Sequence, residues 1–162
     1  MRNEKMASNF ERLIALAEKT FAFRTDPSQI SVNESVMEQL ARIHPASLSE
    51  ERDSDGPVAW VLLFPTTGEL MNAFVEQRIS ERELLDRTAV GESYTAIYLC
   101  SALVLEEHRR NGIAKRLMCD AIRKISKDHP IASLFYWAFT PEGDGLAKSV
   151  AKETKLPLVE RL

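Results

Sequence analysis

The sequence predicts one α/β (α+β) domain with a mixed central β-sheet flanked by helices. Its 162 residues and mass of 18.3 kDa fit a single globular domain with a full hydrophobic core. Hydrophobic residues make up 44% and charged residues 28%, which excludes a disordered, a collagen-like and a disulfide-scaffold chain. In the second half, strand patterns alternate with helix patterns, and this order favours parallel strands joined by a crossover helix.

The N-terminal part, residues 1–56, is expected to be mainly helical. Apolar residues at helical spacing predict one helix over about 8–23 and another from Ser31 to the residue before Pro45. Capping-box patterns, in which a Ser precedes a Glu by three residues, open both helices. The stretch 46–56 is rich in Ser, Glu, Asp and Arg and is predicted to be a loop.

The remaining chain is expected to supply most of the sheet. Continuous apolar runs predict buried strands, whereas a period of 3.6 residues predicts helices. The expected strands lie at about 58–64, 94–105, 131–140 and 157–162, and the expected helices at about 67–78, 81–87, 112–127 and 145–154. The segment PEGDG, with Gly143 and Gly145, is predicted to be a turn. All of 1–162 is expected to form a single domain.

Charge and composition exclude several classes of function. The net charge is −3 and the pI about 5.7, which argues against a nucleic-acid-binding protein. No apolar run approaches the roughly 20 residues of a membrane helix, and no signal-peptide core follows the first residues, so we expect a cytoplasmic protein without a membrane partner. Cys100 and Cys119 lie in apolar patterns and are expected to be reduced, buried and slow to react.

The turn between the run 94–105 and the next helix carries the main functional signal. Positive side chains are unfavourable at a helix N-terminus, which already has partial positive charge. Four basic residues nevertheless crowd this end: Arg109, Arg110, Lys115 and Arg116. Either Glu106 and Glu107 neutralise them, or an anion binds there to the free N–H groups of the helix. Gly112 would let a diphosphate approach the backbone closely.

At this turn the sequence resembles the GNAT superfamily of N-acetyltransferases. The motif R-x-x-G-x-A, formed by Arg109, Gly112 and Ala114, stands between a β-rich run and an amphipathic helix, and the resemblance extends over about 90–155. It implies a GNAT-like fold and an acetyl-CoA-binding core. It also implies transfer of the acetyl group from acetyl-CoA to an amine of a small molecule or a protein, and it suggests a homodimer.

The resemblance implies roles for individual residues in binding acetyl-CoA. Backbone groups near Leu103 and Val104 would bond the pantetheine arm, and Arg109 would orient the loop or contact phosphate. Backbone N–H groups would hold the pyrophosphate, in the segment Arg110, Asn111, Gly112, Ile113, Ala114 and Lys115. The next strand, ending at Phe139 and Thr140, would splay away from 94–105, and acetyl-CoA would lie in the gap.

The catalytic groups are less well defined. Tyr98 matches a position where some family members have a carboxylate that acts as general base. It is therefore a candidate to position the amine or a water, and the alternative is a packed core aromatic. Ala151 stands where many members have a tyrosine that acts as general acid for the departing thiolate. The protein could therefore instead be a catalytically weak or inactive acyl-CoA-binding or regulatory module. A structural α/β domain whose turn merely looks like the motif is also open. The histidines show no metal-ligand spacing, and no metal is expected.

Overall fold

The structure is a computed structural model in which residues 8–21, 30 and 33–162 are described. In this part of the chain the helices are α1 (Asn9–Phe21), α2 (Glu34–Ile43), α3 (Gly68–Val75), α4 (Glu81–Arg87), α5 (Ile113–Asp128) and α6 (Pro141–Thr154). The strands are β1 (Leu48–Asp53), β2 (Gly56–Thr66), β3 (Ala96–Val104), β4 (Ser133–Tyr136) and β5 (Leu158–Glu160). Two short 3₁₀ helices are η1 (Pro45–Ser47) and η2 (Glu106–His108).

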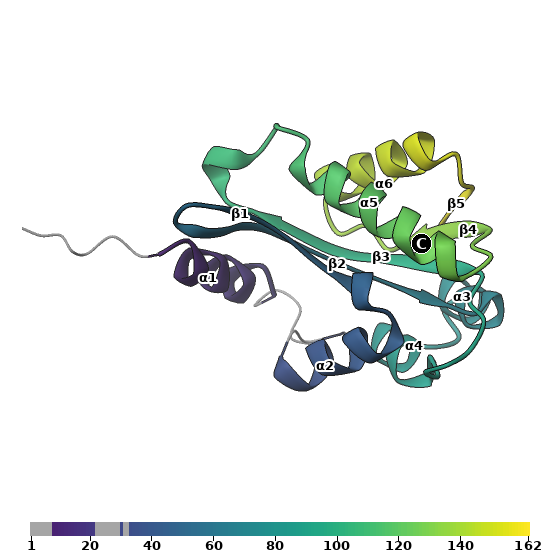
Figure 1. Ribbon diagram of the computed structural model, residues 1–162. Helices are drawn as coiled ribbons and strands as arrows, with labels where there is room; N and C mark the ends of the chain where they lie inside the picture. The colour runs from purple at the N-terminus through teal and green to yellow at the C-terminus, as the bar shows by residue number, and fades with distance from the viewer. Residues whose placement is uncertain (1–7, 22–29, 31–32) are drawn as a thin grey trace, which may run out of the picture.

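The strands form one mixed sheet in the order β1-β2-β3-β4-β5. The pairs β1–β2 and β2–β3 are antiparallel, whereas β3–β4 and β4–β5 are parallel, with α5 and α6 as the connecting helices. Helices α5 and α6 cover one face of the sheet, and α1 to α4 lie on the other (Figure 1). The predicted fold class, a mixed sheet flanked by helices, is therefore confirmed.

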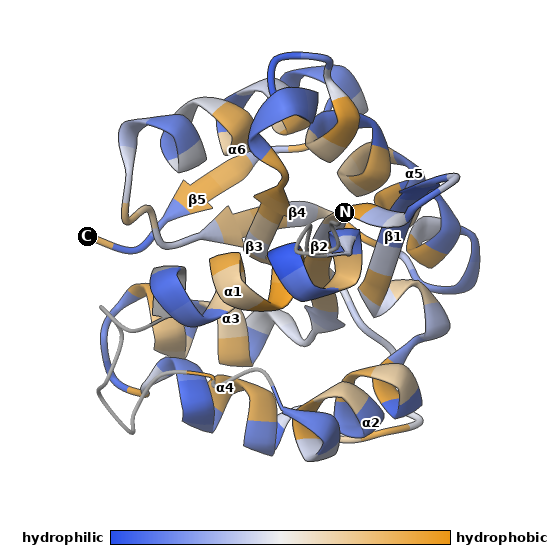
Figure 2. Cartoon of the chain, turned by 90° about the vertical axis from the view of Figure 1, so that its left-hand side faces the viewer, coloured by the Kyte–Doolittle hydropathy of each residue, from blue (hydrophilic) through white to orange (hydrophobic). Residues whose placement is uncertain are grey.

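Two hydrophobic clusters fill the space between the layers. One joins the sheet to α5 and α6 and reaches Leu13 of α1; the other joins the sheet to α2, α3 and α4. The apolar sides of the helices turn toward the strands, while hydrophilic residues lie on the outer sides (Figure 2). No helix in the described residues combines the length and the apolar character needed to cross a membrane.

The helix starts agree with the capping patterns in part. At α1 the Ser8 hydroxyl accepts the Glu11 N–H and the Glu11 carboxylate accepts the Ser8 N–H, both at 3.1 Å, which confirms that box. The predicted residues 22–23 of this helix lie outside the described part of the chain. Helix α2 is capped by Asn33, whose side chain accepts the Val36 N–H at 2.9 Å. Ser31, the predicted start, lies outside the described residues.

The predicted loop 46–56 is wrong, because it contains the edge strand β1. This strand pairs with β2 from Leu48↔Leu62 to Asp53↔Gly56, and none of its residues is fully buried. Edge strands are often rich in charged residues, which discourage pairing with other chains. The hydrophilic composition therefore marks an exposed edge of the sheet and does not mark a loop.

The predicted turn PEGDG is also wrong, because it forms the beginning of α6. The helix begins at Pro141, and its N-cap Thr140 accepts the Gly143 N–H at 3.0 Å. Proline is favoured at the first helical position because its missing N–H would have no helical partner there. Strand β4 is correspondingly shorter than predicted and ends at Tyr136.

Candidate functional site

The site begins where the two central parallel strands separate. The last pair of β3 and β4 is Leu99↔Tyr136, while β3 continues to Val104 paired with β2 alone. At the same point Leu62 pairs with Ser101 and Leu63 with Leu99, so that Cys100 is the extra residue of a β-bulge. The bulge and the divergence of the strands therefore coincide.

Beyond the bulge, β3 presents peptide groups to the side that β4 has left. The Leu105 N–H donates to the Val58 carbonyl at 2.9 Å, so the peptide groups of Leu105 face β2. Peptide groups alternate along a strand, so those of Leu103 also face β2, whereas those of Ala102 and Val104 face the open side. The backbone geometry thus leaves the peptide groups of Ala102 and Val104 open to a ligand, while those of Leu103 face β2.

The side chain of Arg109 ties the following loop to the end of β3. Its Nε donates to the Val104 carbonyl oxygen at 2.9 Å. This bond corresponds to the orienting role among the two roles implied for Arg109. Because it occupies the Val104 carbonyl, the Val104 N–H and the peptide groups of Ala102 remain as the polar groups on this side of the strand.

The loop enters α5 through two residues in the left-handed backbone region. Arg110 has φ +69° and Gly112 has φ +73°. Gly112 is the N-cap and provides no side-chain cap, and the first helical bond runs from the Arg116 N–H to the Gly112 carbonyl at 3.0 Å. The N–H groups of Ile113, Ala114 and Lys115 therefore point out of the helix end, as in sites that bind phosphate.

The charges around this turn are only partly paired. The Glu107 carboxylate binds the Arg12 guanidinium of α1 through two contacts of 2.6 Å. Lys115 and Arg116 have partners elsewhere, Glu153 at 3.6 Å and Glu51 at 3.1 Å. Within residues 8–21, 30 and 33–162, neither Arg109 nor Arg110 forms an ion pair. Glu107 thus neutralises Arg12 of α1 rather than a basic residue of the turn, so the positive charges of Arg109 and Arg110 remain for an anion.

We expect the Arg12–Glu107 pair to show in a pH titration. The hydrogen bonds from Arg12 lower the pKa of Glu107 from 4.5 to about 2. The pair therefore contributes fully above pH 4.5 and is lost as the pH falls toward 2. In an NMR titration Arg12→Ala should return the pKa of Glu107 toward its ordinary value, and an unchanged titration would contradict the contact.

Tyr98 lies in the core and does not border the open side of β3. Its side chain is 0% exposed and packs against the rings of Phe64, Phe74 and Phe135. Its hydroxyl donates to the carboxylate of Glu81, which is itself 1% exposed and also accepts the Ile30 N–H at 2.8 Å. This placement favours the interpretation of Tyr98 as a packed aromatic over its catalytic role.

Helix α6 follows β4, the strand that diverges from β3. Thr140 is occupied as the N-cap of α6, and Ala151 is buried. Tyr136, which sequence reasoning did not single out, ends β4, and its hydroxyl donates to the Asp144 carboxylate at 2.5 Å. Burial, followed by this hydrogen bond, raises the pKa of Tyr136. The phenol is therefore protonated at neutral pH and fixes the start of α6 to the strand.

The two cysteines are expected to differ in reactivity. Cys119 on α5 is 3% exposed, and burial raises its pKa, whereas Cys100 in the bulge is only half-buried. The prediction that both are buried is therefore right for Cys119 alone. We expect iodoacetamide to label Cys100 faster than Cys119 by about tenfold or more in the native protein. Peptide mass spectrometry would measure both rates, and faster labelling of Cys119 would contradict this order.

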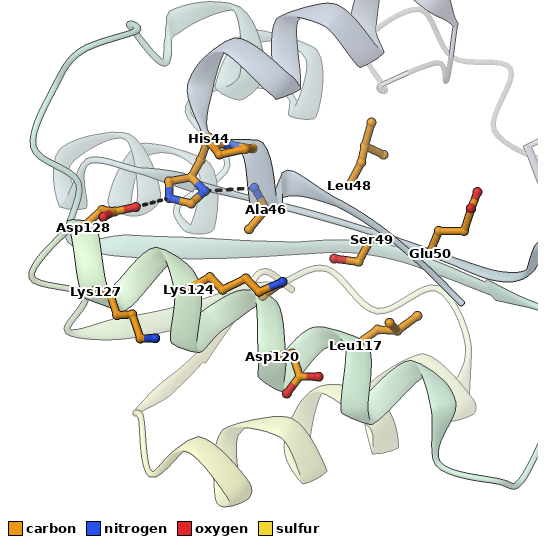
Figure 3. A pocket seen from close by; sticks show the side chains of 12 residues that line it. His44, Ala46, Leu48, Ser49, Glu50, Leu117, Asp120, Lys124, Lys127 and Asp128 are labelled. Atoms are coloured by element: carbon orange, nitrogen blue, oxygen red, sulfur yellow. Dashed lines mark hydrogen bonds and ion pairs between the residues drawn. The ribbon is translucent and has the colours of Figure 1, made fainter. Parts of the chain in front are cut away.

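A pocket of about 590 Å³ lies elsewhere, between η1, β1 and α5 (Figure 3). His44 at its end donates through Nε2 to Asp128 at 2.7 Å and accepts the Ala46 N–H through Nδ1 at 3.0 Å. Both ring nitrogens thus have structural partners. In the described part of the chain no group of three His, Cys, Asp or Glu side chains could hold a metal ion.

The divergence of β3 and β4, followed by the glycine turn at the start of α5, is the arrangement that the resemblance to the GNAT superfamily predicts. The structure is similar to Naa20 of Chaetomium thermophilum in complex with a bisubstrate analogue, with a TM-score of 0.52 and 14% identity over 85% of this chain. The chain spans 63% of the length of that protein. This likeness shows that the chain has the GNAT fold, as the motif predicts.

Other acetyltransferases give lower scores. An aminoglycoside acetyltransferase from an uncultured soil metagenomic sample has a TM-score of 0.49 and 15% identity, over 90% of this chain and 78% of its own. A ribosomal-protein-alanine N-acetyltransferase from Brucella melitensis biovar Abortus 2308 has a TM-score of 0.47 and 17% identity, over 88% and 82%. No protein-family model and no curated protein matches the sequence.

Proposed function

We propose that this protein is an N-acetyltransferase that uses acetyl-CoA and acetylates an amine. The observation that carries the proposal is the combination of two features on one side of β3. The strand loses its neighbour after Leu99↔Tyr136, and the outward N–H groups of α5 stand at the end of the same strand. A long ligand with a diphosphate at one end and an acyl group at the other fits this arrangement.

The described groups suggest how the donor would lie. The pyrophosphate would accept the N–H groups from Arg110 to Lys115, with the side chain of Arg110 adding charge. The pantetheine arm would follow β3 and bond the peptide groups of Ala102 and Val104. The thioester would then reach the bulge at Cys100, where the sheet opens. Thr140 would border the same space from the start of α6.

The chemistry requires little of the protein beyond position and polarisation. A neutral amine attacks the thioester carbonyl, the C–N bond forms, the C–S bond breaks, and CoA leaves as a thiolate. A peptide N–H at the bulge would stabilise the developing oxyanion, and water would take the proton of the amine. Because an ordinary thiol has a pKa of about 8.5, the thiolate can depart without an acid, which accommodates Ala151.

Calorimetry and a turnover assay together test the proposal. Acetyl-CoA should bind and should stabilise the protein by about 2.7 kcal/mol when it is about a hundredfold above its Kd. It should also slow the labelling of Cys100, while Cys119, which is buried in α5, keeps its rate. CoA release should depend on an added amine. Absence of binding at millimolar acetyl-CoA would overturn the proposal, and binding without amine-dependent release would reduce it to an acyl-CoA-binding module.

A further inference from the structure

The aromatic residues that follow β4 point to the chemical class of the acceptor. We propose that the acceptor is a monoamine whose amino group is carried on an apolar, preferably aromatic, group. This inference rests on the proposed acetyl transfer and concerns the side from which the amine reaches the thioester. The residues that carry it are Trp137, Phe139 and Arg161.

The direction of these side chains follows from the packing of their neighbours. Tyr136 and Ala138 pack in the cluster beneath α5 and α6, whereas Trp137 packs against the cluster of α2, α3 and α4. The ring of Phe139 lies 4.5 Å from that of Trp137, so both rings are on the face opposite to α5. Both residues follow the last β3–β4 pair and therefore border the divergence of the strands.

These rings form an apolar wall that is partly exposed. Phe139 is 42% exposed, and Trp137 is half-buried beneath it. The bulged residue Cys100, where the thioester would lie, packs against the same cluster as Trp137. An apolar group attached to the attacking amine would cover the exposed part of the Phe139 ring and remove both surfaces from water.

The positively charged side chain of Arg161 packs against Trp137 of this wall. The guanidinium of Arg161 lies 4.4 Å from the ring centroids of both Trp137 and Phe74, and its Nη1 donates to the Ile79 carbonyl at 3.0 Å. Arg161 forms no ion pair within the described residues. An acceptor with several positive charges would therefore meet like charge at this wall, whereas a monoamine must lose its single charge before it attacks.

The acidic residues of β1 do not offer an alternative site for a cationic acceptor. The carboxylates of Glu50, Glu51 and Asp53 lie on β1, at the edge of the sheet, and already have partners. Glu50 accepts from Arg52 at 2.6 Å and from the Trp60 indole at 2.9 Å, Glu51 pairs with Arg116 at 3.1 Å, and Asp53 accepts from Asn9 at 2.9 Å. This edge is also separated from β4 by β2 and β3.

An acceptor comparison tests the inference. We expect kcat/KM for 2-phenylethylamine to exceed that for ethylamine by about tenfold or more, because one ring is removed from water, and spermidine to be the poorest of the three. Phe139→Ala should lower kcat/KM for 2-phenylethylamine much more than kcat/KM for ethylamine, and so remove most of this preference. Phe10→Ala is the matched control, since Phe10 is also exposed but lies on Trp60 of β2, away from β4.

The outcomes separate this inference from the proposed function. Failure of acetyl-CoA to bind would overturn both. If acetyl-CoA binds and an added amine is acetylated, then preference for spermidine, an equal rate with ethylamine, or an unchanged preference in Phe139→Ala would overturn the acceptor class alone. If acetyl-CoA binds and no amine is acetylated, both the acceptor class and the acetyl transfer would be overturned. Loss of the preference in Phe139→Ala, with the preference retained in Phe10→Ala, would support it.

Discussion

Gly112→Glu should lower the affinity for acetyl-CoA by about a hundredfold or more, equivalent to about 2.7 kcal/mol. The residue caps α5 with φ +73° beside the N–H groups proposed to bind the pyrophosphate. A Cβ built there meets no atom within 4 Å, so the loss would come from the carboxylate and its bulk in the space for the phosphates. The left-handed backbone would also cost about 1–2 kcal/mol of stability. Calorimetric titration with acetyl-CoA measures the effect.

Gly91→Glu is the matched control for this variant. Gly91 also has a left-handed backbone, with φ +85°, and open space around its Cβ position. The substitution adds the same charge and a similar backbone strain, but at a place between α4 and β3 that is far from α5 in sequence and lies outside the proposed site. Both variants should lose similar stability, and only Gly112→Glu should lose binding. Equal binding by the two would mean that the pyrophosphate does not lie on this turn.

Glu81→Ala should destabilise the protein by about 2–6 kcal/mol, because two buried donors lose their acceptor at about 1–3 kcal/mol each. These donors are the Ile30 N–H and the Tyr98 hydroxyl. Tyr98→Phe should cost about 1.5–3 kcal/mol, since it removes one hydrogen bond to a buried carboxylate. Urea unfolding of both variants measures the losses, which are large against the total of about 5–15 kcal/mol for a domain.

Glu69→Ala provides the control for Glu81→Ala. Glu69 also stands in the first turn of a helix, α3, but it is exposed. Its removal should cost only the weak interaction with the helix dipole, about 0.3–1 kcal/mol.

The role of Tyr98 is decided by the urea unfolding of Tyr98→Phe together with its turnover in the acetylation assay. A fall in turnover of folded Tyr98→Phe, without loss of stability, would return Tyr98 to the catalytic role and contradict its placement as a core residue.

The sequence predicted the central elements well because their signals are strong. The run at 94–105 is apolar on both faces, as a strand between two neighbours must be, and the change to a helical period marks α5. The weak places have physical reasons. Strand β1 is exposed at an edge and therefore hydrophilic, and the glycines of PEGDG suggested a turn although Thr140 and Pro141 start a helix there.

The candidate site was predictable only in its local part. The basic turn and Gly112 are contiguous in sequence, and their chemistry is readable there. The side of the strand on which a peptide group lies depends on the register with β2. This register places the peptide groups of Ala102 on the open side and those of Leu103 toward β2. The ion pairs of the turn join residues far apart, such as Arg12 and Glu107, which are 95 positions apart. No local pattern indicates such a pair.

The partners of the turn make its shape dependent on ionic strength. The pairs of Arg12 with Glu107, of Arg116 with Glu51 and of Lys115 with Glu153 lie at the surface and link the turn to α1, β1 and α6. Exposed pairs are weak and are screened by salt, since the Debye length falls to about 3 Å at 1 M. Concentrated salt would thus weaken the binding of acetyl-CoA in two ways. It would screen the charge of the phosphates, and it would loosen the loop proposed to bind them. A neutral osmolyte of equal concentration would do neither.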